Sequence, residues 1–311
     1  MSLALIRFLP TTANLPFIKI RMWAIAFSLF LVLGSLFEFA NVGINFGIDF
    51  RGGIQTEVRT EEPADVEAMR TVVGDLNLGE PRIQQTGNPR EVLISLPLQP
   101  GEGLEGEEAQ QDARRALEAA LETNFPGIEL RGTDVIGGAV SGELVVKGFM
   151  AVTLALFLML IYIWFQFEWQ FSVGAILALT HDVIATVGMF SVTQMTFDLA
   201  TVAAILTIVG YSMNDTVIVY DRIRENLRKY KKMPLGELLN MSINDTLSRT
   251  ILTSSTTLVA LVSLYLIGGE ALKSFSFAMI WGVVIGTYSS IFVAAPLLLL
   301  VGVKRDASEN D

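Results

Sequence analysis

Ionisable side chains inside long apolar runs are the groups of this sequence that could do chemistry. Asp215 and its neighbour Asn214 stand late in one apolar run, and His181 and Asp182 stand midway along the run before it. An aspartate at the centre of a membrane-spanning helix costs roughly 2.5–3.5 kcal/mol on insertion scales, so such residues usually face a protein interior and serve a function. These four residues are therefore our candidates for a proton relay.

Two polar stripes predict which helices meet around Asp215. Thr207, Tyr211, Asn214 and Asp215 recur at helical spacing, and Arg249 heads a small, hydroxyl-rich face of the following run. Burial would disfavour the charged form of the carboxylate and Arg249 would favour it, so that Asp215 could bind and release a proton. Two alternatives stay open: Asp215 as a structural polar contact between helices, and Arg249 as an anchor at the membrane surface.

His181 and Asp182 are weaker candidates than Asp215. Adjacent residues on a helix point about 100° apart, so at most one of them easily shares a relay face. We expect His181 to donate a hydrogen bond to another helix, and Asp182 to be either a second proton site or the partner of His181.

The composition predicts an integral membrane protein. Hydrophobic residues make up 51% of the 311 residues, only 17% are charged, and the mean hydropathy is +0.50. Cysteine is absent and there is a single histidine, which excludes disulfides and thiolate metal sites and argues against a zinc cluster. Six runs are long enough to cross a bilayer: 22–40, 144–164, 171–192, 199–220, 250–267 and 275–301.

Basic residues beside these runs predict the orientation. With six spans they fall on one side, which the positive-inside rule makes cytoplasmic. The segment 1–21, the basic connection 221–249 and the tail 302–311 are then cytoplasmic, and the first run is an uncleaved anchor. The basic connection fits an amphipathic segment against anionic headgroups, with docking of a partner as the alternative and no nucleic-acid signature. The residues counted are Arg7, Lys19, Arg21, Arg222, Arg224, Arg228, Lys229, Lys231, Lys232, Arg249, Lys304 and Arg305.

Residues 41–142 predict a separate domain on the periplasmic side. This segment holds 18 acidic and 8 basic residues, so its net charge of −10 equals that of the whole chain. The pattern reads strand, helix, strand, strand, helix, strand, which is the ferredoxin-like β-α-β-β-α-β unit. We expect strands at 48–60, 82–86, 91–97 and 128–135, and helices at 63–76 and 107–124. Such a domain would serve binding or coupling rather than catalysis.

Two further patterns concern how backbones approach one another. GIDFRGG, residues 47–53, carries glycines suited to a tight bend, but a bend alone does not require the charged Asp49 and Arg51. The last run shows a small residue at every fourth position, which predicts close packing against another helix. These residues are Gly282, Gly286, Ser290 and Ala294.

Together these features resemble the SecF members of the SecD/SecF family of protein-export membrane proteins. The resemblance rests on GIDFRGG, HDV in the third run, GYSMNDTVIVYDRIREN and TLSRT. It implies that Asp215 and Arg249 serve proton passage and that Asp49, Gly52 and Gly53 match the DF-x-GG entrance of the family. The expected fold is an all-α bundle of six transmembrane helices, 22–40 and 143–301, resembling half of an RND transporter, with the ferredoxin-like domain inserted.

The resemblance also implies a function and partners. It predicts a non-enzymatic subunit of the Sec protein-export machinery in the bacterial inner membrane, acting with SecD beside SecYEG and often YajC and YidC. The proton gradient would drive preprotein movement, with H⁺ as coupling ion and no other cofactor. Two alternatives remain: half of an RND-type exporter of small solutes or lipids, and an intramembrane aspartyl protease using Asp182 and Asp215, although the GxGD sequence of that class is absent.

Overall fold

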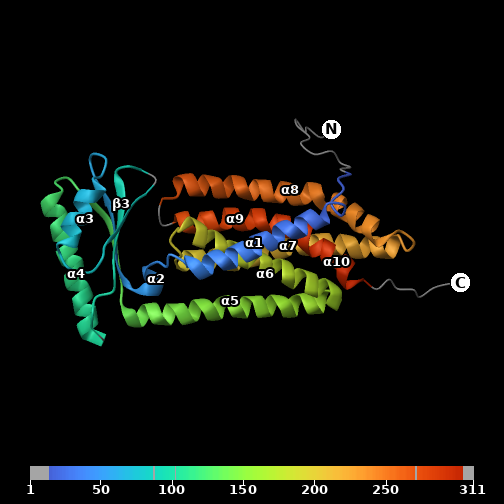
Figure 1. Ribbon diagram of the computed structural model, residues 1–311, viewed down its shortest axis with the longest axis horizontal. Coiled ribbons are helices and arrows are strands. Elements are labelled where there is room, and N and C mark those ends of the chain that lie inside the picture. Colours follow the sequence, from blue (N-terminus) through green and yellow to red (C-terminus); the bar gives the residue numbers. More distant parts are fainter. Residues whose placement is uncertain (1–13, 87, 102, 270–271, 304–311) are drawn as a thin grey trace, which may run out of the picture. The chain divides into compact units, whose positions relative to one another are not determined.

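A computed structural model describes residues 14–86, 88–101, 103–269 and 272–303, and Figure 1 draws the other residues in grey. The chain divides into two compact units. The sheet unit consists of Asn45–Ala151 and Thr196–Leu199, and the helical unit contains the remaining described residues. Arg7, Lys304 and Arg305, counted above for the orientation, lie outside the described residues.

Six helical segments within the described residues are long and apolar enough to cross a membrane, as predicted. The last of them is one continuous segment, Lys273–Val301, made of α9 (Lys273–Ser289), the π-helix η2 (Ser290–Ala294) and α10 (Ala295–Val301). Several helices extend beyond the apolar runs into polar sequence. The other five are α1 (Arg21–Asn41), α5 (Gly138–Gln166), α6 (Trp169–Thr193), α7 (Leu199–Lys229) and α8 (Leu235–Ile267).

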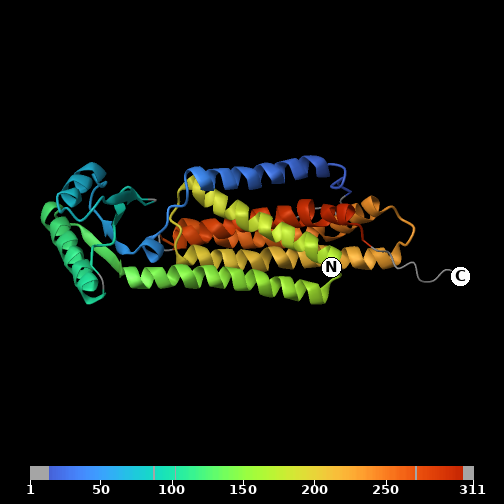
Figure 2. The ribbon, with the colours of Figure 1, turned by 60° about the horizontal axis from the view of Figure 1, so that its bottom comes forward.

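Burial separates central from peripheral helices. In α6, α7 and the segment Lys273–Val301, 56% of the most apolar stretch is buried, against 17% or less in α1, α5 and α8. Figure 2 shows α1 along one edge of the helical unit. The three central helices are therefore the ones that can hold polar groups away from lipid.

The small residues of α9 let it approach α7 closely, as the sequence predicted. A Cβ atom added at Gly282 would lie 2.3 Å from Ile208, and one added at Gly286 would lie 2.9 Å from Cβ of Ser212. Farther along the seam, the Tyr220 hydroxyl donates a hydrogen bond of 3.1 Å to the carbonyl oxygen of Ala294 in η2. The seam thus packs on the helix that carries Asp215.

A π-helix interrupts the last span at Ser290–Ala294, and Pro296 is the second residue of the α-helix that follows it. Proline has no backbone N–H and its ring collides with the carbonyl group four residues earlier, here Phe292, so a regular α-helix cannot continue through this turn. Single π-turns of this kind are often found at functional sites.

The basic connection 221–249 is mostly helical. Helix α7 runs on to Lys229, and α8 already begins at Leu235 after Pro234. The two extensions are held together by an ion pair of 2.8 Å between Arg222 and Asp245 and by a hydrogen bond of 2.9 Å from Asn226 to Ser242. The connection is thus two paired helix ends, and its predicted position against anionic headgroups stays a prediction.

The sheet unit has the predicted β-α-β-β-α-β order. Its four strands form an antiparallel sheet in the order β2-β3-β1-β4, the ferredoxin-like arrangement. The elements are β1 (Gly53–Arg59), α3 (Val66–Gly74), β2 (Arg82–Gln85), β3 (Glu91–Leu96), α4 (Gly103–Asn124) and β4 (Glu129–Ile136).

The core of the sheet unit lies between the sheet and its two helices. Alternate residues of β1 and β3 are buried, and register places Ile54 opposite Leu96 and Val58 opposite Val92. The buried apolar residues of α3 and α4 complete this cluster. They are Met69, Val73, Ala113, Leu117 and Leu121.

Several elements of the sheet unit begin elsewhere than predicted, with α3 at Val66 instead of residue 63 and β4 at Glu129 instead of residue 128. Residues Ile48–Arg51 form a short helix, α2, where we predicted the start of a strand, and β1 begins only at Gly53. The reason is that Gly52 has φ of 72° and Gly53 has φ of 125°, values that break the extended backbone. Helix α4 begins at Gly103, four residues before the predicted start.

Candidate functional site

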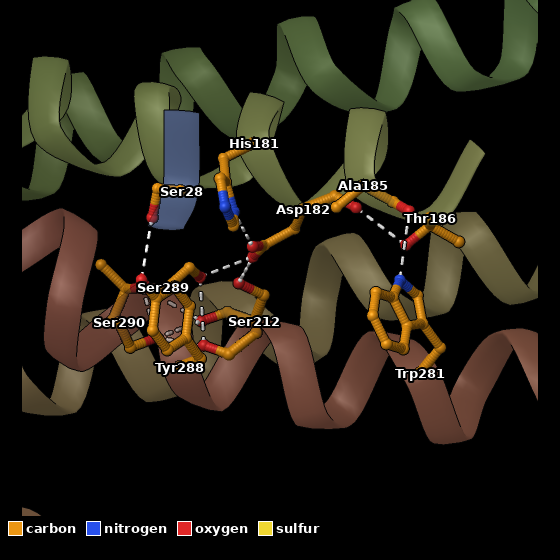
Figure 3. Close-up of polar contacts among 12 residues, drawn as sticks. Ser28, His181, Asp182, Ala185, Thr186, Ser212, Trp281, Tyr288, Ser289 and Ser290 are labelled. Carbon is orange, nitrogen blue, oxygen red and sulfur yellow. Dashed lines mark hydrogen bonds and ion pairs between the residues drawn. The ribbon is translucent and has the colours of Figure 1, made fainter. Parts of the chain in front are cut away.

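The carboxylate of Asp182 is the centre of a buried polar network between the three central helices (Figure 3). Asp182 is fully buried on α6, and its Oδ2 accepts hydrogen bonds from Ser212 of α7 at 2.5 Å and from Ser289 of α9 at 2.7 Å. Hydrogen bonds to a charged acceptor are stronger than neutral ones, and they are obligatory for a carboxylate removed from water. One side chain therefore ties α7 and α9 to α6.

His181 is bonded to its own neighbour and not to another helix. Its Nδ1 lies 3.0 Å from Oδ1 of Asp182, and its Nε2 has no hydrogen-bond partner among the described residues. Its ring lies beside that of Tyr288, with the centroids 6.1 Å apart. The predicted interhelical hydrogen bond is therefore wrong: the imidazole turns back on Asp182, and the adjacent pair acts as one unit.

Serine and threonine hydroxyls extend the network along the same helices. The Ser290 and Thr216 hydroxyls lie 2.9 Å apart, which joins η2 to α7. Adjacent side chains on a helix diverge, so Ser289 reaches α6 while Ser290 reaches α7. The sequence analysis missed Ser289. The adjacent hydroxyl residues Ser289 and Ser290, within the small-residue pattern of the last span, could have indicated it.

A second set of contacts connects α1 to the central helices. The Tyr288 hydroxyl lies 3.0 Å from the Ser28 hydroxyl and donates a hydrogen bond of 2.8 Å to the carbonyl oxygen of Ala24. Two turns away along α9, the indole N–H of Trp281 donates to the carbonyl oxygen of Ala185 at 3.2 Å (Figure 3). The network therefore fixes helix positions over several turns.

Asp215 is also buried, but its surroundings differ from those of Asp182. Its side chain lies on α7 with 1% of its surface exposed, and its Oδ2 has no hydrogen-bond partner among the described residues. The described residues form no direct ion pair between Asp215 and Arg249 of α8, so any effect of the arginine on the carboxylate is electrostatic and acts over a longer distance. The carboxylate is thus buried, under-bonded and within the electrostatic reach of one cation.

The exposed face of α7 carries some of the polar residues that we placed beside Asp215. Asn214 and Thr207 are exposed and Arg249 is exposed on α8, whereas Asp215 is buried. Adjacent positions 214 and 215 differ by about 100° around the helix, which is enough to put one inside and one outside. The single polar stripe that we predicted is therefore divided between two faces.

The entrance motif lies within the sheet unit and holds the start of α7. The Asp49 carboxylate accepts a hydrogen bond of 2.8 Å from the backbone N–H of Leu199, the first residue of α7. The first amides of a helix have no partner inside the helix, and negative charge is favourable at this end. Asp49 thus satisfies one of these amides from a distant part of the chain.

Backbone and aromatic contacts complete this junction. Gly47 N–H donates to the Phe197 carbonyl oxygen and Phe197 N–H to that of Asn45, both at 2.8 Å. The rings of Phe46, Phe50 and Phe197 form a cluster with centroids 5.8 to 6.0 Å apart. A Cβ atom at Gly47 would lie 3.1 Å from Thr196, so the motif needs a small residue there.

Gly52 and Gly53 turn the chain from α2 into β1. Besides their positive φ, a Cβ atom at Gly52 would lie 2.9 Å from Leu98, and one at Gly53 would lie 2.3 Å from the carbonyl oxygen of Leu96. A side chain at Gly53 would displace the backbone of β3, and one at Gly52 would be strained by the positive φ. The backbone conformation thus explains why glycines stand at positions 52 and 53, and the hydrogen bond to Leu199 explains why an acidic residue stands at position 49.

The described residues hold no group of three or more histidine, cysteine, aspartate or glutamate side chains that could bind a metal ion. The buried carboxylates of the helical unit are instead two separated aspartates, one saturated with hydrogen-bond donors and one not. Such an arrangement can hold helices together at one point and respond to protonation at another.

Comparison with known proteins identifies the family. The sequence model described as "Protein export membrane protein SecD/SecF, C-terminal" matches residues 116–304, and "SecD/SecF GG Motif" matches residues 39–64. "Protein translocase subunit SecF" of Rickettsia felis is 44% identical over 95% of this chain and 94% of its own length, and that of Rhodobacter capsulatus is 42% identical over 98% and 94%.

Solved structures agree with these matches. The crystal structure of SecDF, a translocon-associated membrane protein from Thermus thermophilus, matches with a TM-score of 0.84 and 35% identity over 94% of this chain. The chain spans only 39% of the length of that SecDF chain. The multi-pass chain described here belongs to the SecD/SecF family of protein-export membrane proteins and, within it, to the SecF group.

Proposed function

We propose that this protein is a subunit of the Sec protein-export machinery that uses the proton gradient, together with a SecD partner, to drive or complete preprotein movement across the bacterial inner membrane. The relatives named protein translocase subunit SecF and the translocon-associated SecDF support this proposal. The match to SecDF, of which this chain spans 39%, supports a SecD-like partner in the assembly. The role is transport, not catalysis, with H⁺ as the coupling ion.

The state of Asp215 is the observation that carries the proposal. A buried carboxylate without a hydrogen-bond partner at Oδ2 is poorly stabilised in its charged form, and the charge of Arg249 offsets part of that. Protonation cancels the attraction to Arg249, and deprotonation restores it. Asp215 is therefore suited to take up a proton from one side of the membrane and release it to the other.

The two aspartates have different roles in this proposal. Asp182 binds donors from α7 and α9 and keeps these helices on α6, with His181 as its partner. Asp215 has no such bonds, so the contact of α7 with α8 is the one that changes with protonation. Asn214, exposed beside Asp215, faces the SecD partner or the water-filled path of the proton.

The basic flanks support the orientation in the membrane that we propose. Both termini are cytoplasmic and residues 41–142 are periplasmic, where a preprotein emerges from the SecYEG channel. YajC and YidC are further partners in this assembly. The acidic sheet unit then works on the side of the membrane at which transport is completed.

The proposal is tested in membrane vesicles that carry this protein with SecD and SecYEG. Asp215→Asn removes the titratable group while keeping the size and polarity of the side chain. We expect export driven by the proton gradient to be abolished, while co-purification with SecD is unchanged. Asp221→Asn, an exposed aspartate on the same helix, is the matched control and retains export.

Two results would count against this function. Undiminished gradient-driven export by Asp215→Asn would show that no essential proton passes through this carboxylate. Loss of co-purification with SecD would make Asp215 a structural residue. Gradient-driven efflux of a small solute without any preprotein would favour the exporter alternative.

A further inference from the structure

The contact between the entrance motif and the start of α7 is a coupling element. We call residues 45–50 together with 196–199 the α7 junction, and all of them belong to the sheet unit. We propose that the α7 junction transmits movement of α7 to the sheet unit, with Asp49 as the positioning residue. This inference rests on the proposed function, because it gives the proton site on α7 a route to the domain that handles preprotein.

One of the places where the chain crosses between the two units is the start of α7. Leu199 is the first residue of α7 but belongs to the sheet unit, whereas the rest of α7, including Ser212 and Asp215, belongs to the helical unit. A continuous helix of 31 residues transmits displacement along its axis because its backbone hydrogen bonds resist extension. A shift of α7 along its axis at Asp215 therefore reaches Leu199.

Contacts within the α7 junction are dense. Three hydrogen bonds of 2.8 Å join the two segments: Leu199 N–H to Asp49, Gly47 N–H to Phe197 and Phe197 N–H to Asn45. Phe46 and Phe197 also pair as an isolated parallel β-bridge. A loop that served only to connect α6 with α7 would not need backbone pairing with a segment 150 residues away.

The chain after Asp49 is packed tightly against the sheet. Helix α2 ends at Gly52, and Gly52 and Gly53 pack directly on the end of β3 and the residues after it, so the segment that holds Leu199 is continuous with the central strand β1. Strand β1 pairs with both β3 and β4. A displacement received by Asp49 is thus delivered to a central strand of the sheet and not to an edge strand.

The contact at Asp49 is also the one that a single substitution can remove. The Asp49 carboxylate is the only side-chain acceptor that the described residues give to the Leu199 amide, and asparagine at this position offers an equivalent oxygen. Asp49→Ala removes the acceptor and leaves the chain connections intact. Asp49→Asn keeps it and should restore most of the function.

The test uses the complete protein with SecD and SecYEG in vesicles, and measures both gradient-driven export and proton flux with an internal pH dye. We expect Asp49→Ala to lower export several-fold while proton flux that depends on Asp215 persists. A purely structural role would lower both in proportion. Glu122→Ala, an exposed carboxylate of α4, is the matched control and leaves both unchanged.

A covalent rescue tests the junction itself. The chain has no cysteine, so Phe46→Cys and Phe197→Cys introduce the only thiols, at the two positions of the β-bridge. In the Asp49→Ala background we expect oxidation of this pair to restore export and a reductant to abolish it again. Each cysteine alone should restore nothing.

The outcomes separate this inference from the function on which it rests. Export that is unchanged by Asp49→Ala, or that falls in proportion to proton flux, overturns the coupling role. So does an oxidised cysteine pair that restores nothing. If Asp215→Asn abolishes export but Asp49→Ala does not, only the junction is refuted; if Asp215→Asn has no effect, the proposed function fails and the coupling role fails with it.

Discussion

Asp182 and Asp215 show how environment gives two identical side chains different tasks. Both are buried within the helical unit, but Asp182 has three hydrogen-bonding neighbours and Asp215 has an unpartnered oxygen among the residues that the structure describes. A carboxylate that accepts several hydrogen bonds is stabilised in one state and serves as a fixed point. A carboxylate that has one oxygen without a hydrogen-bond partner and no directly bound cation can be protonated or deprotonated without breaking other contacts.

Substitution of Asp182 should therefore affect stability more than transport chemistry. Asp182→Ala leaves the Ser212 and Ser289 hydroxyls and His181 without their shared acceptor, so we expect a loss of about 1–3 kcal/mol in the free energy of unfolding. Asp182→Asn keeps an acceptor oxygen and should retain most of the gradient-driven export. Thermal unfolding of the purified protein and export in vesicles measure the two effects.

The alternative for Asp182 is a second proton site. In that case Asp182→Asn would abolish export while the protein unfolds at the same temperature as the unsubstituted chain. That outcome would contradict the role of a fixed point between α6, α7 and α9. Ser289→Ala provides a milder control, because the loss of one hydroxyl in a membrane protein costs about 0.6 kcal/mol on average.

At the scale of elements, the packing of α9 on α7 determines where the polar network can form. Gly282 and Gly286 bring the two backbones together, and this proximity lets Ser290 bond to Thr216. The sequence pattern was sufficient to predict a close helix contact, because a small residue at every fourth position leaves one face of a helix without bulky side chains. It did not identify the partner helix, since the pattern on α7 contains no complementary signal.

A methyl group placed in this contact should separate the helices. In Gly286→Ala the new Cβ lies 2.9 Å from Cβ of Ser212, and overpacking of this kind costs about 1–3 kcal/mol. We expect a lower unfolding temperature and weaker export, because the bond between Ser212 and Asp182 is displaced. Gly210→Ala, at a position with nothing within 4 Å of the added atom, is the matched control.

We expect the control substitution not to lower the unfolding temperature. Alanine is favoured over glycine in a helix by up to about 1 kcal/mol, so Gly210→Ala should leave the unfolding temperature unchanged or raise it. Equal destabilisation by both substitutions would mean that the seam is not the tight contact that the geometry describes.

At the scale of the whole molecule, the pattern of hydrophobic residues predicts the helices and strands and their order, but it does not predict which distant side chains contact one another. The six spans and the β-α-β-β-α-β order were predictable because period and length are properties of single segments. The bond from Asp49 to Leu199 joins residues 150 positions apart, and no local pattern encodes it. Likewise Asn214 and Asp215 share a sequence pattern, but only the packing of neighbouring helices decides which of them is buried.

The two units have separate hydrophobic cores, which makes their stabilities separable. One cluster of buried side chains lies between the sheet and its helices α3 and α4, and the other lies among the helices of the membrane spans. Since side chains of one cluster do not fill the other, a defect in one core should open that unit first. Hydrogen exchange resolved by peptide can follow each unit on its own.

Leu117→Ala is the substitution that tests this independence. Leu117 is fully buried on α4, and truncation of a buried leucine costs about 2–5 kcal/mol. We expect faster amide exchange in β1, β3 and α4, whereas exchange in α6 and α7 stays slow because their contacts are unchanged. Leu104→Ala on the same helix, where the side chain is 79% exposed, should change neither. Faster exchange of α6 and α7 in the Leu117 variant would mean that the two cores unfold together.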